Sequence, residues 1–475
     1  MPRFAVLLSL LLTASGLLLG QGAPPFQTDF PADELAQRRA RVLDAIGKDA
    51  IAIVQGAAGV DGFKVFRQSN ELYYLTGLES PHAYLVLDGR NRRSTVFLPH
   101  RNDALERSTG ARWSAEDAAD VQRLTGVDAV APVELLSHQT FGAMLRPPRP
   151  VLYVPFSPAE AEAQSRDELL AHQAGVAADP WDGRPSREAH FLGLLASRYP
   201  ALERRDLTPI LDAMRYVKSP REIALIRTAS KLAGLGLLEA MKATRPGVFE
   251  YQVAAAARFT FLANGARYEG YNPIAAGGTN AWMGHYSRNA DALRTGDMVL
   301  MDYAPDLRYY TSDVTRMWPV SGTYTDGQRT LARFVLAYRD AFLRHIKPGV
   351  TPEDVLALAR RDMEPVLART TFASERHRKA AAAMLAFAGH LQHPVGMSVH
   401  DPGRIWGRPF EPGVVFTVDP MMWIDDERLY VRMEDTIVVT SDGIENFTAT
   451  LASTPEEIEA VMKADGLLSR VPRLP

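Results

Sequence analysis

Four carboxylates and one imidazole in the second half of the chain could together hold divalent metal ions. Each carboxylate lies on or beside a stretch of otherwise apolar residues that predicts a β-strand. Burying an unpaired carboxylate costs several kcal/mol, and four of them close together would also repel one another. One or two divalent cations would remove both costs. The five residues are Asp302, Asp313, His393, Asp419 and Glu434.

Two of the acids end apolar runs in the same way. Asp302 follows the apolar residues 298–301, and Asp419 follows the apolar residues 414–418. A lone aspartate at a strand end usually caps or turns the chain, and for any single acid this is the better explanation. The metal prediction therefore depends on the whole set.

The last acid shares an expected strand with an arginine. Residues 429–439 are rich in β-branched residues, so we expect one continuous strand there. Side chains alternate across a strand, which puts Arg432 and Glu434 on the same face. Arg432 could orient the Glu434 carboxylate by a charge-assisted hydrogen bond, or the two could form a plain salt bridge. We expect His393 to lie in a loop.

Oxygen ligands with a single imidazole suit several cations. Mn²⁺, Co²⁺, Zn²⁺ and Fe²⁺ all accept such a set, and the residues alone do not choose among them. Four carboxylates can bridge two ions about 3.5–4 Å apart, an arrangement that activates a shared water molecule. The chain has no cysteine, which excludes thiolate ligands, iron–sulfur clusters, disulfides and cysteine nucleophiles.

A weak internal repeat suggests that this region consists of two related halves. Residues 246–248 and 348–350 both read Pro-Gly-Val, at an offset of 102. Gly296 and Gly413 each precede one of the strand-ending aspartates by six residues. Such short matches also arise by chance, but two in the same order predict a domain of two α+β halves that face one another.

The composition is that of a folded protein whose net charge is close to zero. The 475 residues suggest two or three domains, and 46% are hydrophobic. Lys and Arg number 53 against 56 Asp and Glu, which argues against nucleic acid or an anionic membrane as the main partner.

Residues 1–23 combine a positive start, an apolar run and small residues, as in a secretory signal peptide. A membrane anchor is the alternative, but it needs about 20 apolar residues. We therefore expect a periplasmic or secreted protein.

We expect two domains after the signal peptide. Residues 27–210 alternate strands and helices and predict an α/β domain. The expected strands are 50–54, 83–87 and 94–98, and the expected helices are 115–124 and 158–174. Residues 211–475 form the second domain. Its first helix begins with a capping box from Ser219 to Glu222 and runs to about Ala243.

These motifs give both domains a family resemblance. The second domain resembles the "pita-bread" metallopeptidases, a family that includes methionine aminopeptidase, aminopeptidase P and prolidase, and it is most similar to aminopeptidase P. The first resembles the creatinase-type N-terminal domain through residues 67–77. The matching strings in the second domain are Lys218–Ile223, Gly265–Tyr268, Tyr271–Ile274, His285–Tyr286, Val299–Asp302, Ser312–Arg316, Val399–Gly403 and Val431–Asp435.

The resemblance implies roles for individual residues. The five candidate ligands would hold two divalent ions, Mn²⁺ first and Co²⁺ or Zn²⁺ as alternatives, with Asp313 and Glu434 bridging them. His285 and His400 would flank the scissile bond and steady the tetrahedral intermediate. Asp419 would also accept a proton from the attacking water. The expected catalytic residues are therefore His285, His400, Asp419 and Arg432.

The resemblance also implies a substrate class and leaves alternatives open. Family members remove an N-terminal residue that precedes proline, or split Xaa-Pro dipeptides as prolidases do. Creatinase shares both domains but works without metal, so the acids argue against it. A relative that has lost catalysis and only binds remains a further alternative. By analogy we expect a homo-oligomer, either a dimer or a tetramer.

The sequence departs from the family pattern at two positions. Asp419 stands where the family usually has Glu, so its arm is shorter by one carbon–carbon bond of about 1.5 Å. Aminopeptidase P has a further histidine four residues before the metal-binding one. Here that position is Gly389, and His390 follows it. We expect proline recognition or stabilisation of the intermediate to differ.

Overall fold

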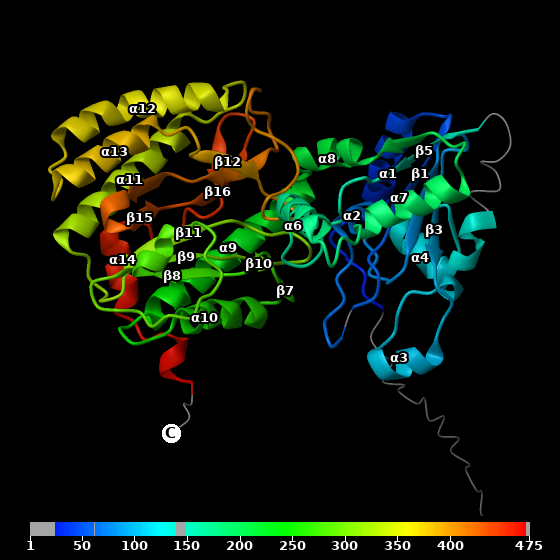
Figure 1. Ribbon diagram of the computed structural model, residues 1–475, viewed down its shortest axis with the longest axis horizontal. Helices are drawn as coiled ribbons and strands as arrows, with labels where there is room; N and C mark the ends of the chain where they lie inside the picture. The colour runs from blue at the N-terminus through cyan, green and yellow to red at the C-terminus, as the bar shows by residue number, and fades with distance from the viewer. Residues whose placement is uncertain (1–23, 61, 139–148, 472–475) are drawn as a thin grey trace, which may run out of the picture.

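The computed structural model describes residues 24–60, 62–138 and 149–471, arranged as two domains side by side (Figure 1). The predicted signal peptide, residues 1–23, lies outside the described residues. Within the described ranges, no helix is long and apolar enough to cross a membrane.

The first domain is built on one mixed sheet with helices on both faces. The strand order is β4-β3-β2-β1-β5-β6, and only β1–β2 and β2–β3 pair antiparallel. The strands are β1 (Ala50–Gln55), β2 (Tyr84–Asp88), β3 (Arg93–Leu98), β4 (Ala129–Pro132), β5 (Val151–Val154) and β6 (Arg204–Asp206). The helices are α1 (Ala32–Ile46), α2 (Asn70–Thr76), α3 (Asp103–Thr109), α4 (Ala118–Thr125), α6 (Arg166–Ala178) and α7 (Arg187–Arg198), with short 3₁₀ turns η1 (Ala115–Asp117) and η2 (Val133–Leu135).

Alternation along β1 supplies both cores of this domain. Ala52 and Val54 belong to the core under α1, whereas Ile51 and Ile53 pack with Leu195 of α7 on the other face. The three expected strands are confirmed. The expected helix 115–124 is a 3₁₀ turn followed by α4.

The helix expected at 158–174 begins later than the sequence predicted. Residues 158–165 are not helical, and α6 starts at Arg166. Ala163 has a left-handed backbone with φ of 50°, which no α-helix accommodates, and Ser165 is the extended N-cap. This correction matters because the irregular segment runs along the junction with the second domain.

The second domain has two sheets surrounded by helices. One sheet has the order β11-β9-β8 and the other β12-β13-β16-β17, with all pairs antiparallel. Two short ribbons, β10–β7 and β14–β15, complete the strands. The strands are β7 (Tyr268–Glu269), β8 (Ile274–Gly277), β9 (Met298–Asp302), β10 (Pro305–Asp306), β11 (Thr315–Pro319), β12 (Leu391–Pro394), β13 (Val415–Val418), β14 (Met421–Ile424), β15 (Leu429–Arg432), β16 (Asp435–Val439) and β17 (Ile444–Asn446).

Long helices cover the sheets on their outer side (Figure 1). The first long helix, α9, runs from Pro220 to Ala243, and Ser219 and Glu222 form the predicted capping box. The short helix α8 (Thr208–Tyr216) packs with the core of the first domain. The other helices are α9 (Pro220–Ala243), α10 (Glu250–Ala263), α11 (Asp326–His345), α12 (Pro352–Arg369), α13 (Glu375–Ala386) and α14 (Pro455–Met462), with 3₁₀ turns η4 (Gly278–Trp282), η5 (Asp425–Glu427) and η6 (Leu467–Ser469).

The internal repeat is visible in the backbone. Gly247 and Gly349 have φ of 85° and 82°, a left-handed conformation that glycine adopts without cost. Their N–H groups donate to equivalent carbonyls, those of Leu293 at 2.8 Å and Phe410 at 2.9 Å. Each turn then leads into a helix, α10 or α12. The two halves therefore share a local structure as well as a sequence pattern.

Two sequence expectations near the candidate ligands were wrong. Residues 429–439 form two strands, because β15 pairs with β14 while β16 pairs with β13, and Glu434 lies between them. His393 lies in β12 and not in a loop, although the pairing of β12 with β13 is irregular around it. The change of partner strand turns the chain at Glu434.

Candidate active site

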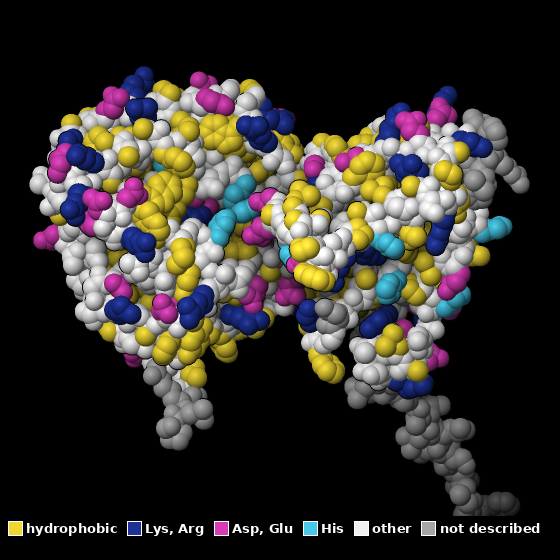
Figure 2. All heavy atoms as spheres, in the orientation of Figure 1, with side chains coloured by type: hydrophobic (Ala, Val, Ile, Leu, Met, Phe, Trp, Pro, Cys, Tyr) yellow, Lys and Arg dark blue, Asp and Glu magenta, His cyan; other side chains and the backbone are white. Residues whose placement is uncertain are grey.

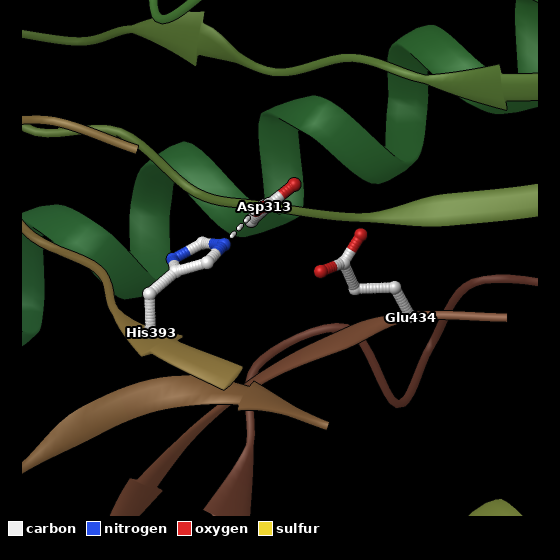
Figure 3. Close-up of side chains that lie close together, drawn as sticks. All are labelled: Asp313, His393 and Glu434. Atoms are coloured by element: carbon white, nitrogen blue, oxygen red, sulfur yellow. Dashed lines mark ion pairs between the residues drawn. The ribbon is translucent and has the colours of Figure 1, made fainter. Parts of the chain in front are cut away.

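Three of the five expected ligands form a compact cluster. Asp313, His393 and Glu434 each offer one ligand atom, and these atoms all lie within 4.8 Å of one another. Figure 3 shows the three side chains pointing toward a common centre from separate elements. The Nε2 atom of His393 lies 3.5 Å from Oδ2 of Asp313. Asp313 and Glu434 are buried.

Arg432 joins the other two expected ligands to this cluster. Its guanidinium donates to Asp302 at 2.8 Å, to Asp419 at 2.8 Å and to Glu434 at 2.7 Å. The predicted contact with Glu434 is present, but the sequence did not reveal the other two. A guanidinium has donors in a rigid fork, so it can hold three carboxylates in fixed positions at once. All four acids therefore converge.

Three further polar residues hold the carboxylates, and sequence reasoning gave none of them a role. The Tyr271 hydroxyl lies 2.6 Å from Oδ1 of Asp302 and 3.0 Å from Oδ1 of Asp313. Thr315 Oγ1 donates to Glu434 at 2.9 Å. Gln392 Nε2 donates to Asp419. Tyr271 stands in one of the strings that carry the family resemblance, and Gln392 directly precedes His393, but neither fact by itself indicated these bonds.

The electrostatics of the cluster favour a bound cation. Burial and the neighbouring carboxylates, Glu434 and Asp302, raise the pKa of Asp313 well above its usual range. Burial likewise raises the pKa of Glu434, although Arg432 opposes this. Burial raises the pKa of Asp419 to about 6. Oε1 of Glu434 is buried without a hydrogen-bond partner. A divalent ion would satisfy that oxygen and favour the ionised acids, so this donor set fits one.

The expected histidine ligand is suited to metal binding. Burial, together with the nearby His400 and Arg432, lowers the pKa of His393 to about 3. Its imidazole is therefore neutral at physiological pH, and a nitrogen lone pair is available to a metal.

The two expected catalytic histidines flank the cluster. The ring centroids of His393 and His400 are 4.1 Å apart, and those of His400 and His285 are 6.0 Å apart. Two cavities of about 700 Å³ and about 200 Å³ border the site, and both are lined by His285, His393 and Arg432. Figure 2 shows histidine side chains at the surface where the second domain faces the first. An extended peptide could thus reach the cluster.

His390 lies next to Gly389, the position where aminopeptidase P has its further histidine, but His390 does not take the place of that histidine. His390 is fully buried, and its Nε2 lies 2.8 Å from the carbonyl of Met384. Its ring packs edge-on against Phe387. Burial lowers its pKa to about 4, so the ring is a neutral structural group. Gly389 lines the larger cavity, and a Cβ there would approach the Phe387 ring to 2.6 Å.

Comparison with known proteins places this geometry in a family. Residues 224–441 match the model of metallopeptidase family M24, and residues 35–152 match that of the aminopeptidase P N-terminal domain. The Xaa-Pro aminopeptidase of Escherichia coli is 31% identical over 470 residues, which cover 92% of this chain and 99% of that protein. The chain belongs to the aminopeptidase P family of M24 metallopeptidases.

Solved structures agree with this assignment. Aminopeptidase P from E. coli with the inhibitor Pro-Leu has a TM-score of 0.73 at 28% identity and covers 92% of this chain and 99% of its own. A putative aminopeptidase P from Bacillus anthracis shares the fold, with a TM-score of 0.76 at 23% identity, over 92% of this chain and 100% of its own. The expected pita-bread domain and its aminopeptidase P-type N-terminal domain are confirmed. The protein is a metallo-aminopeptidase, and its family uses divalent metal ions.

Proposed function

We propose that the protein is an exported aminopeptidase that removes an N-terminal residue preceding proline and uses two divalent metal ions. The observation that carries this proposal is the convergence of Asp313, His393 and Glu434 within 4.8 Å, beside His400. Relatives named Xaa-Pro aminopeptidase that align over nearly the whole chain support the substrate class.

The residues suggest how the site would be used. Asp302, Asp313, His393, Asp419 and Glu434 would hold the ions. When bound, the ions polarise the scissile carbonyl and promote ionisation of the attacking water. We propose Mn²⁺ first, as the family resemblance implies, with Co²⁺ and Zn²⁺ as the alternatives, because this donor set suits all three. A structure of E. coli aminopeptidase P is described as zinc-substituted.

The side chains around the ligands would perform the remaining tasks. The carboxylate of Asp419 would accept the proton of the attacking water. His285 and His400 would face the developing oxyanion and stabilise its charge. Arg432 and Tyr271 would keep the ligand carboxylates in place, so we assign Arg432 a positioning role.

A peptide panel tests the proposal. X-Pro-Y peptides should be cleaved after X with Mn²⁺, Co²⁺ or Zn²⁺ present, and matched X-Ala-Y peptides should be cleaved far more slowly. Ala-Pro compared with Ala-Pro-Ala distinguishes a prolidase, which would favour the dipeptide. Bound metal without turnover of any Xaa-Pro peptide would instead indicate a non-catalytic relative.

Export and assembly need separate measurements. The proposal of export rests on the signal-like residues 1–23, and N-terminal sequencing of protein from the periplasm or medium would test it. A dimer or tetramer is proposed by analogy with two-domain relatives, and light scattering coupled to size-exclusion chromatography would measure the mass.

A further inference from the structure

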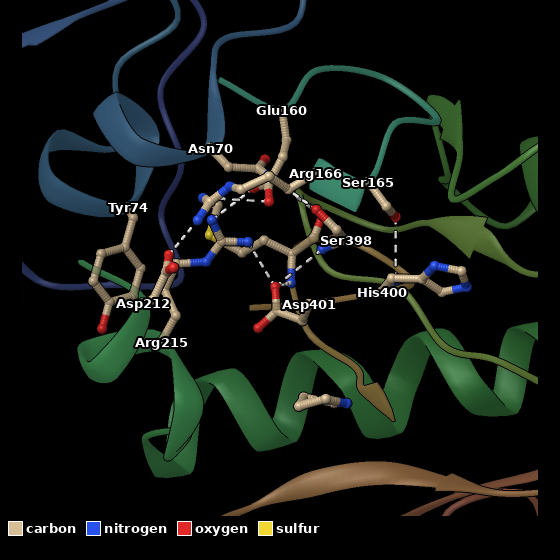
Figure 4. Close-up of polar contacts among 12 residues, drawn as sticks. Asn70, Tyr74, Glu160, Ser165, Arg166, Asp212, Arg215, Ser398, His400 and Asp401 are labelled. Carbon is tan, nitrogen blue, oxygen red and sulfur yellow. Dashed lines mark hydrogen bonds and ion pairs between the residues drawn. The ribbon is translucent and has the colours of Figure 1, made fainter. Parts of the chain in front are cut away.

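The first domain reaches the active site through the beginning of α6. Ser165 is fully buried, and its Oγ accepts the backbone N–H of His400 at 3.1 Å. Two residues later, Oδ2 of Asp167 lies 2.7 Å from Nδ1 of the His400 ring. Figure 4 shows the Ser165 contact beside a larger group of polar side chains between the domains. His400 is therefore held at both its backbone and its ring.

Arg166 fixes this segment to the rest of the first domain. Its guanidinium donates to Glu71 at 2.9 Å and to Asp212 at 2.5 Å. Arg215 continues the network, since it donates to Glu160 at 2.6 Å and to Asp401 at 2.6 Å. Asp401 is the residue directly after His400, so the same buried network holds the neighbouring peptide from the other side.

Asp401 also closes the loop that carries His400. Its Oδ1 accepts the N–H groups of Met397 at 3.1 Å and Ser398 at 3.3 Å, and its Oδ2 accepts from Lys218 at 2.9 Å. The backbone of the loop is thus fixed without any help from Asp167. What Asp167 adds is a bond to the imidazole itself.

We propose that Asp167 is a positioning residue that fixes the ring of His400 for catalysis. A carboxylate only accepts, so the contact requires a hydrogen on Nδ1 of His400 and leaves Nε2 as the nitrogen available to substrate. The Asp167 side chain is 60% exposed, and the buried Ser165 and Arg166 provide the docking of α6. Removing the Asp167 side chain should therefore change the orientation of the His400 ring and leave the fold intact. The inference rests on the proposed role of His400.

Kinetics of matched variants test this role. Asp167→Ala should lower kcat on an X-Pro-Y peptide by about 10- to 100-fold with KM changed less than about twofold, and Asp167→Glu should restore much of the loss. Asp120→Ala is the control. Asp120 occupies the first turn of α4, is 61% exposed and pairs with Arg123, and its loss should leave kcat unchanged.

A double-mutant cycle separates this role from a general structural one. If Asp167 acts through the imidazole, Asp167→Ala should cause no further loss of kcat in a His400→Ala background. Losses that multiply in the double variant would overturn the proposal, as would wild-type kcat in Asp167→Ala.

Spectroscopy tests the inference even if the proposed activity is absent. In protein loaded with diamagnetic Zn²⁺ and labelled with ¹⁵N-histidine, Nδ1 of His400 should give the signal of a protonated nitrogen, assigned by its loss in His400→Ala. Asp167→Ala should shift that signal, and an unchanged signal would refute the contact. Failure of the wild-type protein to cleave any Xaa-Pro peptide would refute the proposed function alone.

Discussion

Thr315 and Glu434 join the two halves of the second domain at the candidate metal site. They form an isolated antiparallel bridge, in which the Glu434 N–H donates to the Thr315 carbonyl at 3.0 Å. The Thr315 hydroxyl then donates to Oε2 of Glu434 at 2.9 Å. Thr315, the first residue of β11 in the first half, thus positions the Glu434 carboxylate of the second half. The pairing of the two halves therefore helps to set the geometry of the site.

Replacing Thr315 by valine should weaken metal binding more than folding. Thr315→Val keeps the shape of the side chain and removes the hydrogen bond to Glu434, which costs about 1.5–3 kcal/mol for a charged acceptor. We expect metal affinity to fall by about 10- to 100-fold, as measured by competition with a chelating dye.

Thr417 provides the matched control. It is also buried in a strand of the same domain, but its Oγ1 has no hydrogen-bond partner. Thr417→Val should leave metal affinity unchanged and should not lower the thermal midpoint. Equal effects of the two variants would mean that the hydroxyl of Thr315 does not position its carboxylate.

Apolar runs and short motifs were sufficient to predict much of the fold. Three strands of the first domain (β1, β2 and β3), the capping box at Ser219 and the repeat of two halves all come from local patterns of residues, whereas the short strands β4, β5 and β6 were not predicted. The expected strand through Glu434 failed because β-branched content does not reveal a change of partner strand. That change arises because β13 and β14 are two short strands interrupted at Asp419 and Pro420, and β15 and β16 each pair with a different one.

The candidate ligands were proposed from the sequence, whereas the residues that hold them in place were not. Asp302 and Asp419 stood out only as members of a set, because four acids on or beside apolar strands are harder to explain as turn residues than any one of them. Tyr271 and Gln392 are ordinary residues in the sequence, and only the fold shows that they contact ligands. The contribution of Asp167 was equally hidden, because 233 positions separate it from His400.

Loss of a single ligand carboxylate should abolish both activity and metal content. Asp302→Ala and Glu434→Ala each remove one ligand of the proposed pair of ions and leave Arg432 with fewer partners. Metal analysis and a peptidase assay would measure both effects. Near-wild-type rates in either variant would contradict the site assignment.

Asp435→Asn is an informative comparison for those variants. Asp435 is buried next to Glu434 but bonds Arg316 at 2.7 Å and Arg339 at 2.6 Å, not the metal cluster. Removing its charge should lower the thermal midpoint, because breaking a buried ion pair costs about 3–5 kcal/mol. The folded fraction should still bind the wild-type amount of metal.

Chelation should destabilise the protein more at high pH than at low pH. Without metal, burial raises the pKa of Asp419 to about 6 and those of Asp313 and Glu434 well above their usual range. Raised acid pKa values stabilise the fold at low pH, and that contribution is lost as pH rises through the folded-state values. Bound metal neutralises the same carboxylates. The difference in thermal midpoint between metal-loaded and EDTA-treated protein should therefore grow from pH 5.5 to pH 8, and a shrinking difference would count against a metal at these acids.

Glu71 and Glu160 are two buried acids near the junction of the domains. They should also make the protein less stable as pH rises. Burial and repulsion by Glu160 raise the pKa of Glu71 to about 7, despite Arg166 and Arg215 nearby. Oε2 of Glu71 is buried without a hydrogen-bond partner, so no donor stabilises a negative charge on that oxygen. The stability from neutral Glu71 is fully present below its ordinary pKa and is lost as pH rises through 7.

Glu71→Gln tests this interpretation because the amide resembles the protonated acid. The variant should match the wild type at pH 5 and be more stable at pH 8 by up to about 3 kcal/mol, from the conversion of about 1.4 kcal/mol per unit of pKa. Thermal unfolding at the two pH values would measure it, with the exposed Glu168→Gln as a control. A variant that is less stable at pH 8 would show that the ionised carboxylate is the form the network needs.

Asp419→Glu should keep or raise peptidase activity. The aspartate carboxylate is held by Arg432 at 2.8 Å and by Gln392, and it borders the larger cavity of about 700 Å³. One extra methylene extends the arm by about 1.5 Å, and the cavity leaves room for it, so the longer acid could reach the proposed ions without displacing β13. Steady-state rates on an X-Pro-Y peptide with Mn²⁺ and Co²⁺ would measure the effect. Complete loss of activity with full metal content would mean that the backbone around Asp419 has adapted to the shorter acid, and that this enzyme places its proton acceptor differently from its relatives.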